Sequence, residues 1–424
     1  MGGGLLQLVA YGAQDVYLTG NPQITFFIAV YRRHTNFAIE SIQQTFNGTP
    51  GYGSRVTCTI ARNGDLVHRV YLALDLSSAA GDSLCKFYGL RLINYAEVEI
   101  GGQKIDKQYS HWMYIWNELS LPQSKKLGYY DMVGAYGGNP GTGVNKNLYI
   151  PLEFWFCRNV GLALPLISLQ YHEVKININF ESANRCGGGG ATDPTSGFGA
   201  SLWVDYIFLD TDERRRFAQL SHEYLIEQLQ YNGPETIQDA NPKPKLTFNH
   251  PCKELIWFVT SKLTSSTHDD NNNWFNYTSD ASTTTKLLLT DDEPQMRKKL
   301  RPSAITASDL PSKNHITNAK LVLNGNDRFA QRNGSYFNLV QPYQHHENIP
   351  MNAGINVYSF ALKPEEHQPS GTLNMSRIDT AVLQLSMTKS SSDLTAAVYN
   401  LHVFAVNYNV LRIMSGMGGI AYSN

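Results

Sequence analysis

Apolar and polar side chains alternate along many short segments of this chain. The side chains of Val56, Cys58 and Ile60 alternate with polar ones, and residues 70–76 and 174–180 repeat the pattern. A period of two places apolar side chains on one face of a strand and polar side chains on the other. Because Asn-Gly and Pro separate many of these segments, the pattern predicts half-buried antiparallel strands joined by turns.

Helical periodicity is rare in comparison. Residues 108–119 and 211–220 each fit a short helix, and no heptad repeat is present. The second helix carries Arg214, Arg215 and Arg216 next to several acidic residues. We expect these arginines to form local ion pairs and not a nucleic-acid site.

An internal repeat defines the domain organisation. Residues 93–102 read INYAEVEIGG and residues 316–325 read ITNAKLVLNG, with the apolar positions kept. Four further segments pair in the same order: 39–43 with 226–230, 56–58 with 246–248, 174–180 with 381–387, and 202–209 with 401–408. Ordered self-similarity of this kind predicts two tandem copies of one β domain, divided near residues 211–222.

The spacing between paired segments grows most between residues 260 and 316. This stretch is rich in Ser, Thr, Asn and Asp, a composition typical of a long surface loop. Trp274 and Phe275 offer apolar anchors, so we expect the loop to be partly ordered. The glycine-rich segments 128–147 and 183–200 are interpreted as the corresponding loops of the first copy.

Composition narrows the classes of protein that remain. Hydrophobic residues make up 42% of the 424 residues, too many for a disordered chain. Charged residues make up 17%, below the typical value of about 25%. Lys and Arg number 35 against 36 Asp and Glu, a balance that argues against specific nucleic-acid binding. A surface poor in charge suits a protein that packs against copies of itself.

Cysteines and the N-terminus are consistent with a reduced, intracellular protein. The five cysteines are far apart and lack a C-x-x-C pair, so neither a disulfide framework nor a zinc site is expected. No apolar run reaches the length of about 18 residues that a membrane span needs. The N-terminus lacks the basic region of a signal peptide, and Leu6 stands where the myristoylation motif has Ser or Thr.

None of the common catalytic or ligand-binding motifs is present. His172-Glu173 does not continue as H-E-x-x-H, and we interpret both residues as strand surface. His345-His346-Glu347 contains metal-ligand types, but neighbouring residues of a strand point to opposite faces. Walker, dinucleotide-binding and nucleophile-elbow motifs are absent. We therefore expect no catalytic residue, no cofactor and no metal site.

Four N-x-[ST] sequons occur, at Asn47, Asn276, Asn333 and Asn374. Without a signal peptide the usual glycosylation route is closed, so we interpret each as a turn or strand residue. Asn276 lies in the long loop and is therefore the one glycosylation candidate.

Five segments together carry a resemblance to a known family. They are GAQDVYLTGNPQITFFIAVYRRHTNFAIES (12–41), FWFCRNVGLALPLISLQYHEVKI (154–176), FNHPCKELIW (248–257), NMSRID (374–379) and YNVLRIMSGMGGIAYSN (408–424). In this order they resemble the major capsid proteins of the nucleocytoplasmic large DNA viruses, especially the chlorella-virus and phycodnavirus type. The chain departs from the family mainly in the loops.

The resemblance implies an all-β fold of two tandem eight-stranded antiparallel jelly rolls with short helices and long loops. Its domains would be an N-terminal arm (1–24), a first jelly roll (25–211), a linker (212–222) and a second jelly roll (223–424). The second roll would carry the insertion 262–315. Family architecture implies that this insertion faces outward, where protease would cut it first in intact particles.

The resemblance also implies a non-enzymatic capsid protein. Three chains would form a pseudo-hexagonal capsomer, and capsomers would build the icosahedral shell of a virion assembled in the host cytoplasm. Its partners would be further copies of itself, minor capsid and penton proteins and, indirectly, an internal viral membrane; no specific nucleic acid is expected. A jelly-roll carbohydrate-binding protein or glycosidase is the alternative, because a sandwich fold alone does not define function.

The N-terminal arm contains an apolar cluster after its glycines, formed by Leu5, Leu6, Leu8, Val9 and Tyr11. Two interpretations are open. The cluster docks beneath the shell and becomes ordered on assembly, or it packs against the first jelly roll of its own chain.

Overall fold

The computed structural model describes residues 3–79, 81–141, 145–188, 193–262, 273–278, 314–388 and 398–422. Its contacts divide the chain into two units, 1–36 and 37–424, and each is described by itself. The first unit contains two short helices, α1 (Gly3–Val9) and α2 (Val16–Thr19), and neither buries a residue. The first strand begins at Phe37, after the apolar cluster of the arm.

The first half of the second unit contains a five-stranded and a four-stranded sheet with antiparallel pairing throughout. One sheet has the order β1-β9-β3-β6. Its strands are β1 (Phe37–Gln44), β9 (Gly199–Leu209), β3 (Leu66–Asp75) and β6 (Asn147–Pro151), and the short β7 (Leu164–Pro165) also pairs with β3. The other sheet has the order β2-β8-β4-β5. Its strands are β2 (Arg55–Thr59), β8 (Val174–Phe180), β4 (Ile93–Ile100) and β5 (Gln103–Tyr109).

The second half repeats both sheets. The sheet β10-β20-β13-β17 consists of β10 (His222–Tyr231), β20 (Val398–Met414), β13 (Pro251–Lys262) and β17 (Asn356–Ser359). Three short strands extend it: β11 (Glu235–Ile237), β18 (Leu373–Asn374) and β21 (Met417–Ile420). The sheet β12-β19-β14-β15 consists of β12 (Lys245–Leu246), β19 (Ala381–Met387), β14 (Ile316–Leu323) and β15 (Asn326–Asp327), with β16 (Arg332–Asn333) paired to β14.

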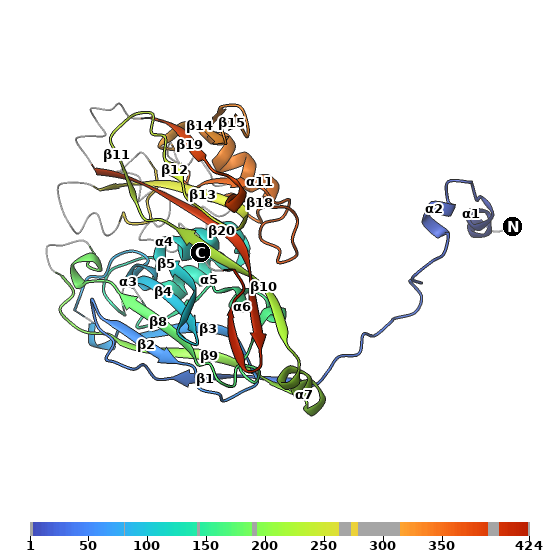
Figure 1. Cartoon of the computed structure of the whole chain (residues 1–424), viewed down its shortest axis with the longest axis horizontal. Coiled ribbons are helices and arrows are strands. Elements are labelled where there is room, and N and C mark those ends of the chain that lie inside the picture. The colour runs from blue at the N-terminus through green and yellow to red at the C-terminus, as the bar shows by residue number, and fades with distance from the viewer. Residues whose placement is uncertain are drawn as a thin grey trace. The chain divides into compact units, whose positions relative to one another are not determined.

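Equivalent strands therefore occupy equivalent places, which confirms the internal repeat. The repeated segments 93–102 and 316–325 contain β4 and β14, and each lies third in its sheet. Both are followed by a tight turn with a glycine at positive φ, Gly102 and Gly325, as an L side chain would be strained there. The fold is a double jelly roll, as predicted. Figure 1 shows β10 and β20 continuing from the second roll along the first.

The two predicted helices are confirmed as α4 (Ser110–Ser120) and α7 (Thr211–Gln219). Asp210 caps α7 by accepting a hydrogen bond from the Thr211 N–H. Arg216 pairs locally with Glu213, but Arg214 reaches Asp65 of the first roll, with Nε and Oδ1 2.9 Å apart. That second pair is not the local one expected.

Among the helices that the sequence did not predict, two bear on the surfaces described below. The segment 128–147 was interpreted as a glycine-rich loop, but α5 (Gln123–Val133) includes Gly128 and ends only at Gly134, whose φ is +70°. In the second roll a π-helix, η7 (Tyr336–Val340), continues into α11 (Gln341–His345). His345-His346-Glu347 is therefore the end of a helix and the loop after it, not a strand. His172 and Glu173 likewise precede β8 and do not lie within it.

Most of the predicted insertion 262–315 lies outside the described residues. Its predicted outward orientation concerns the same residues and therefore stays a prediction. Residues 273–278 are described, and they confirm the predicted anchoring. The ring of Phe275 lies 4.8 Å from Tyr114 of α4, and Trp274 stacks on His111 at 4.7 Å between ring centroids. The anchor thus binds the second roll's loop to the first roll.

Candidate assembly surfaces

The two rolls share one hydrophobic cluster at their junction. The outward face of the β10-β20-β13 sheet carries Tyr231, Phe258 and Phe404, which belong to the core cluster of the first roll and not to that of the second. Tyr109 at the end of β5 contacts Tyr231, with ring centroids 4.9 Å apart, and Trp112 of α4 contacts Phe404 at 5.8 Å. The first roll therefore covers this sheet face with β5 and α4.

Polar contacts fix the register of the junction. The Gln228 side chain donates a hydrogen bond to the Ile105 carbonyl, and the Leu229 N–H donates one to Asp106 Oδ1 at 3.0 Å. Burial raises the pKa of the Asp106 carboxyl, although the Leu229 N–H opposes that shift. These bonds satisfy groups that would otherwise be buried without partners.

A chain of charges also crosses the junction. Arg158, at the end of α6 (Trp155–Arg158) in the first roll, lies 3.2 Å from Glu227 of β10. Glu227 also accepts a hydrogen bond of 2.6 Å from Lys253 of β13, whose side chain is fully buried. Arg158, Glu227 and Glu365 line a cavity of about 370 Å³ between the rolls.

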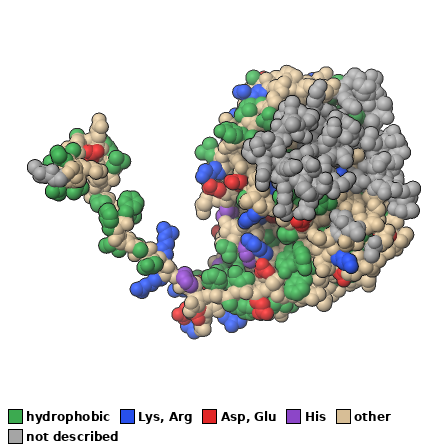
Figure 2. All heavy atoms as spheres, turned by 180° about the vertical axis from the view of Figure 1, so that it is seen from behind, with side chains coloured by type: hydrophobic (Ala, Val, Ile, Leu, Met, Phe, Trp, Pro, Cys, Tyr) green, Lys and Arg blue, Asp and Glu red, His purple; other side chains and the backbone are tan. Residues whose placement is uncertain are grey.

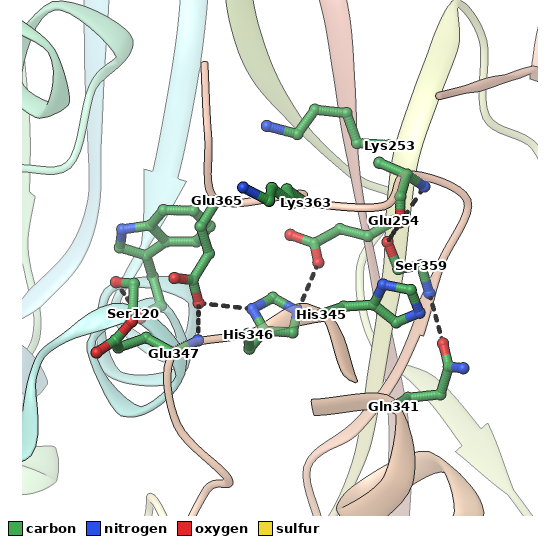
Figure 3. Close-up of polar contacts among 12 residues, drawn as sticks. Ser120, Lys253, Glu254, Gln341, His345, His346, Glu347, Ser359, Lys363 and Glu365 are labelled. Carbon is green, nitrogen blue, oxygen red and sulfur yellow. Dashed lines mark hydrogen bonds and ion pairs between the residues drawn. The ribbon is translucent and has the colours of Figure 1, made fainter. Parts of the chain in front are cut away.

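His346 is the centre of a second buried charge cluster (Figure 3). Its Nε2 lies 3.0 Å from Glu254 Oε2, and its Nδ1 lies 2.8 Å from Glu365 Oε1. Burial disfavours the imidazolium, but Glu254 and Glu365 outweigh it and raise the pKa of His346 to about 9. Both nitrogens of this imidazole therefore face carboxylate oxygens. Among the described residues no group of His, Cys, Asp or Glu has the geometry of a metal site.

Two further histidines at the junction are buried without an acidic contact among the described hydrogen bonds and ion pairs. His111 Nδ1 lies 2.8 Å from the Tyr277 hydroxyl, and His402 bonds the hydroxyls of Tyr231 and Thr260 at 2.7 and 3.0 Å. The two imidazoles are 5.2 Å apart. Burial lowers the pKa of His402 to about 4; burial, His402 and Arg91 lower that of His111 well below its usual value.

The five cysteines are buried as free thiols. Burial raises the pKa of the Cys58 thiol to about 11 and that of Cys85 to about 12, so both stay protonated and unreactive at neutral pH. No helix among the described residues is long and apolar enough to cross a membrane.

Asn276, the predicted glycosylation candidate, lies between the buried residues Phe275 and Tyr277. Its side-chain oxygen accepts hydrogen bonds from the Thr278 N–H and hydroxyl at 3.0 and 2.6 Å. Asn333 and Asn374 accept the equivalent N–H bond from Ser335 and Ser376. These three sequons form turns; glycosylation at Asn276 stays a prediction.

Sheet β1-β9-β3-β6 of the first roll has an outward face on which, among the described residues of the second unit, Tyr149 is exposed and Tyr71 and Trp203 are half-buried. Tyr71 and Trp203 stack there with parallel rings 6.4 Å apart, and Tyr149 meets Tyr71 edge-on at 6.2 Å. A groove of about 860 Å³ runs between this face and α5, lined by these two tyrosines together with Tyr129 and Met132.

The second roll exposes an apolar helix surface. Leu339, Val340 and Tyr343 of η7 and α11 are exposed, while Phe337 on the opposite side is buried in the core of the roll. On the face of the molecule in Figure 2, hydrophobic side chains (green) also lie at the surface, beside other side chains and backbone (tan). No periodic pattern along the chain predicts this helix, because Pro342 and Asn338 interrupt a good helix pattern.

Comparison with known proteins agrees with this architecture in both halves. Residues 25–210 match the family model described as the major capsid protein N-terminus. Residues 213–419 match the model of the large eukaryotic DNA virus major capsid protein.

Relatives match over the full length of the chain. It is 52% identical to the major capsid protein of Pyramimonas orientalis virus and 45% identical to that of Paramecium bursaria Chlorella virus 1, with 100% of each chain covered. The quasi-atomic model of the PBCV-1 virus capsid superposes with a TM-score of 0.77 at 38% identity, covering 94% of this chain and 100% of that one.

Two equivalent eight-stranded rolls, matched in this way, define a double jelly-roll capsid protein. The chain belongs to the family of large eukaryotic DNA virus major capsid proteins, which is a structural family and not an enzyme family. Such proteins form the shell of the virion, so the surfaces described above are candidates for contacts between copies.

Proposed function

We propose that three copies of this chain form a capsomer with a pseudo-hexagonal outline and that such capsomers tile an icosahedral shell. Full-length similarity to capsid proteins of phycodnaviruses carries the proposal. The equivalence of the two rolls supports it, because three chains with two similar rolls each present six similar lobes around one axis. Cyclic symmetry closes such a ring without leaving free interfaces.

Light scattering on the purified chain tests the proposal. We expect a stable mass of about three times 47.5 kDa at micromolar concentration, because obligate interfaces bury more than about 2,000 Å² and resist dissociation. A soluble, long-lived monomer under the same conditions would refute the trimer.

The finer features of the function follow from the same proposal. The protein acts without catalytic residues or a cofactor, contacts minor capsid and penton proteins, and assembles in the host cytoplasm. The arm lies on the inner side of the shell, towards an internal membrane. A carbohydrate-binding protein or glycosidase, the alternative function, receives no support from the family matches.

The N-terminal arm gives a separate prediction about assembly. Neither α1 nor α2 buries a residue, and residues 1–36, which include the arm, form a unit of their own. Deleting residues 2–10 should therefore leave trimers intact by light scattering and reduce the yield of shells in electron micrographs. Failure of the deleted protein to fold would show instead that the arm belongs to the core.

A further inference from the structure

The junction within the chain has a counterpart on the first roll that the described residues cover only in part. In the second roll, Phe258 of β13 pairs with His402 of β20, and this face is covered by α4 and β5 of the first roll. In the first roll, Tyr71 of β3 pairs with Trp203 of β9 at the equivalent place. The core residues beside them also correspond, since Leu72 pairs with Leu202 and Val259 pairs with Leu401.

Helix α4, which covers the second roll, has a counterpart in the second roll whose apolar side is exposed. Helix α4 lies in the connection from β5 to β6. The equivalent connection of the second roll, between β15 and β17, contains η7 and α11. Leu339, Val340 and Tyr343 have the spacing i, i+1 and i+4, so they share one side of this helix, and all three are exposed.

Resting on the proposed trimer, we infer that η7 and α11 of one copy pack on the Tyr71–Trp203–Tyr149 face of the next copy. The contact repeats between chains the junction that exists within each chain, with the second roll covering the first. Because the two surfaces differ, the contact is head-to-tail and is satisfied for every copy only in a closed ring. The aromatic groove then receives an apolar helix side in place of water.

Substitution of one tyrosine on each surface tests the inference. Tyr343→Glu on the helix and Tyr149→Glu on the sheet should each raise the dissociation constant of the trimer at least about 30-fold, because each buries a charge at an aromatic contact. Tyr171→Glu is the matched control, since Tyr171 and Tyr343 are 75% and 76% exposed. Light scattering over a concentration series gives the trimer fraction, and circular dichroism checks the fold.

The outcomes separate this inference from the proposed trimer. A monomeric wild-type chain overturns both. A trimeric wild type with fully trimeric Tyr343→Glu and Tyr149→Glu variants overturns the inference alone. Folded monomers for those two variants and trimers for Tyr171→Glu support it.

A cross-linking experiment tests the proposed contact if a glutamate variant does not fold. Ala73 lies opposite Tyr149 on the same sheet face, and the native cysteines are all buried. The double variant Ala73→Cys/Tyr343→Cys, treated with a short bismaleimide, should yield covalent dimers and trimers on a denaturing gel, and each single variant should yield monomers. Only monomers from a trimeric double variant overturn the inference.

Discussion

Replacing His346 with leucine is expected to lower the free energy of unfolding by about 3–5 kcal/mol, because it leaves a buried carboxylate without its partner. The side chains of His346 and Glu254 are both 0% exposed, and His346 Nε2 is the charged group that faces Glu254 Oε2. A carboxylate without solvent or a counter-charge pays a desolvation penalty that the remaining contacts do not offset. Chemical denaturation of the variant and the wild type at fixed protein concentration measures the difference.

His345→Leu is the matched control for this substitution. It removes a neighbouring imidazole whose Nδ1 contacts only the Leu362 carbonyl among the described bonds, at 3.0 Å, so a loss of about 0.5–1.5 kcal/mol is expected. The double variant His346→Leu/Glu254→Leu should recover much of the lost stability, because removing both charges abolishes the penalty. Equal losses for the single and double variants would contradict the explanation by an unpaired charge.

The pH dependence of this pair has a definite sign. The pKa of His346 is raised from 6.5 to about 9 in the folded chain. Its contribution to stability is therefore fully present below pH 6.5 and is lost as the pH rises through about 9. The stability gap between the wild type and His346→Leu should narrow over that range.

Acidification is expected to weaken the junction between the rolls through His402 and His111. The pKa of His402 falls from 6.5 to about 4 in the folded chain, so the unfolded chain binds protons that the folded chain excludes. Stability is then lost as the pH falls from 6.5 towards 4, and His402 alone accounts for about 3 kcal/mol at pH 4. His111, 5.2 Å away, titrates in the same direction and adds to the loss.

A non-titrating side chain at the same place tests this expectation. The His402→Asn variant should show a shallower fall in the denaturation midpoint between pH 6.5 and 4 than the wild type. His34→Asn, at an exposed position of the first unit, is the control and should leave the pH profile unchanged. Parallel profiles for the wild type and His402→Asn would show that acid acts elsewhere.

Among the described residues, several side chains contact the two histidines, and none of them is a carboxylate. His111 faces Arg91, Trp274, Phe275 and Phe258, and His402 faces Tyr231, Thr260 and Phe258. Arg91 is paired with Glu181 at 3.4 Å. In the described part of the chain, a proton on either imidazole therefore meets hydroxyls, aromatic rings and other cations, which stabilise it poorly.

The sequence alone was sufficient for the repeat and the class of fold. Period-two alternation depends only on the geometry of a strand, and the pairs 93–102 with 316–325 and 202–209 with 401–408 retained it in both copies. The helices α4 and α7 were predicted from helical periodicity, which likewise depends only on residues close together along the chain. Helix α5 was not predicted because Gly128 and a weakly apolar pattern give little helical periodicity. This helix is stabilised by packing instead.

Only the tertiary structure decided which surfaces are covered. Tyr71 and Phe258 occupy equivalent strand positions and are both aromatic, yet Phe258 is buried against the first roll while Tyr71 is only half-buried and lies beside the exposed Tyr149. The sequence pattern predicted a strand at His346, whereas the structure shows a buried imidazole between two carboxylates. The pattern could not show this, because Glu254 and Glu365 come from distant segments. Strand patterns are set by neighbours along the chain, whereas burial and pairing are set by neighbours in space, and a single sequence records only the first kind directly.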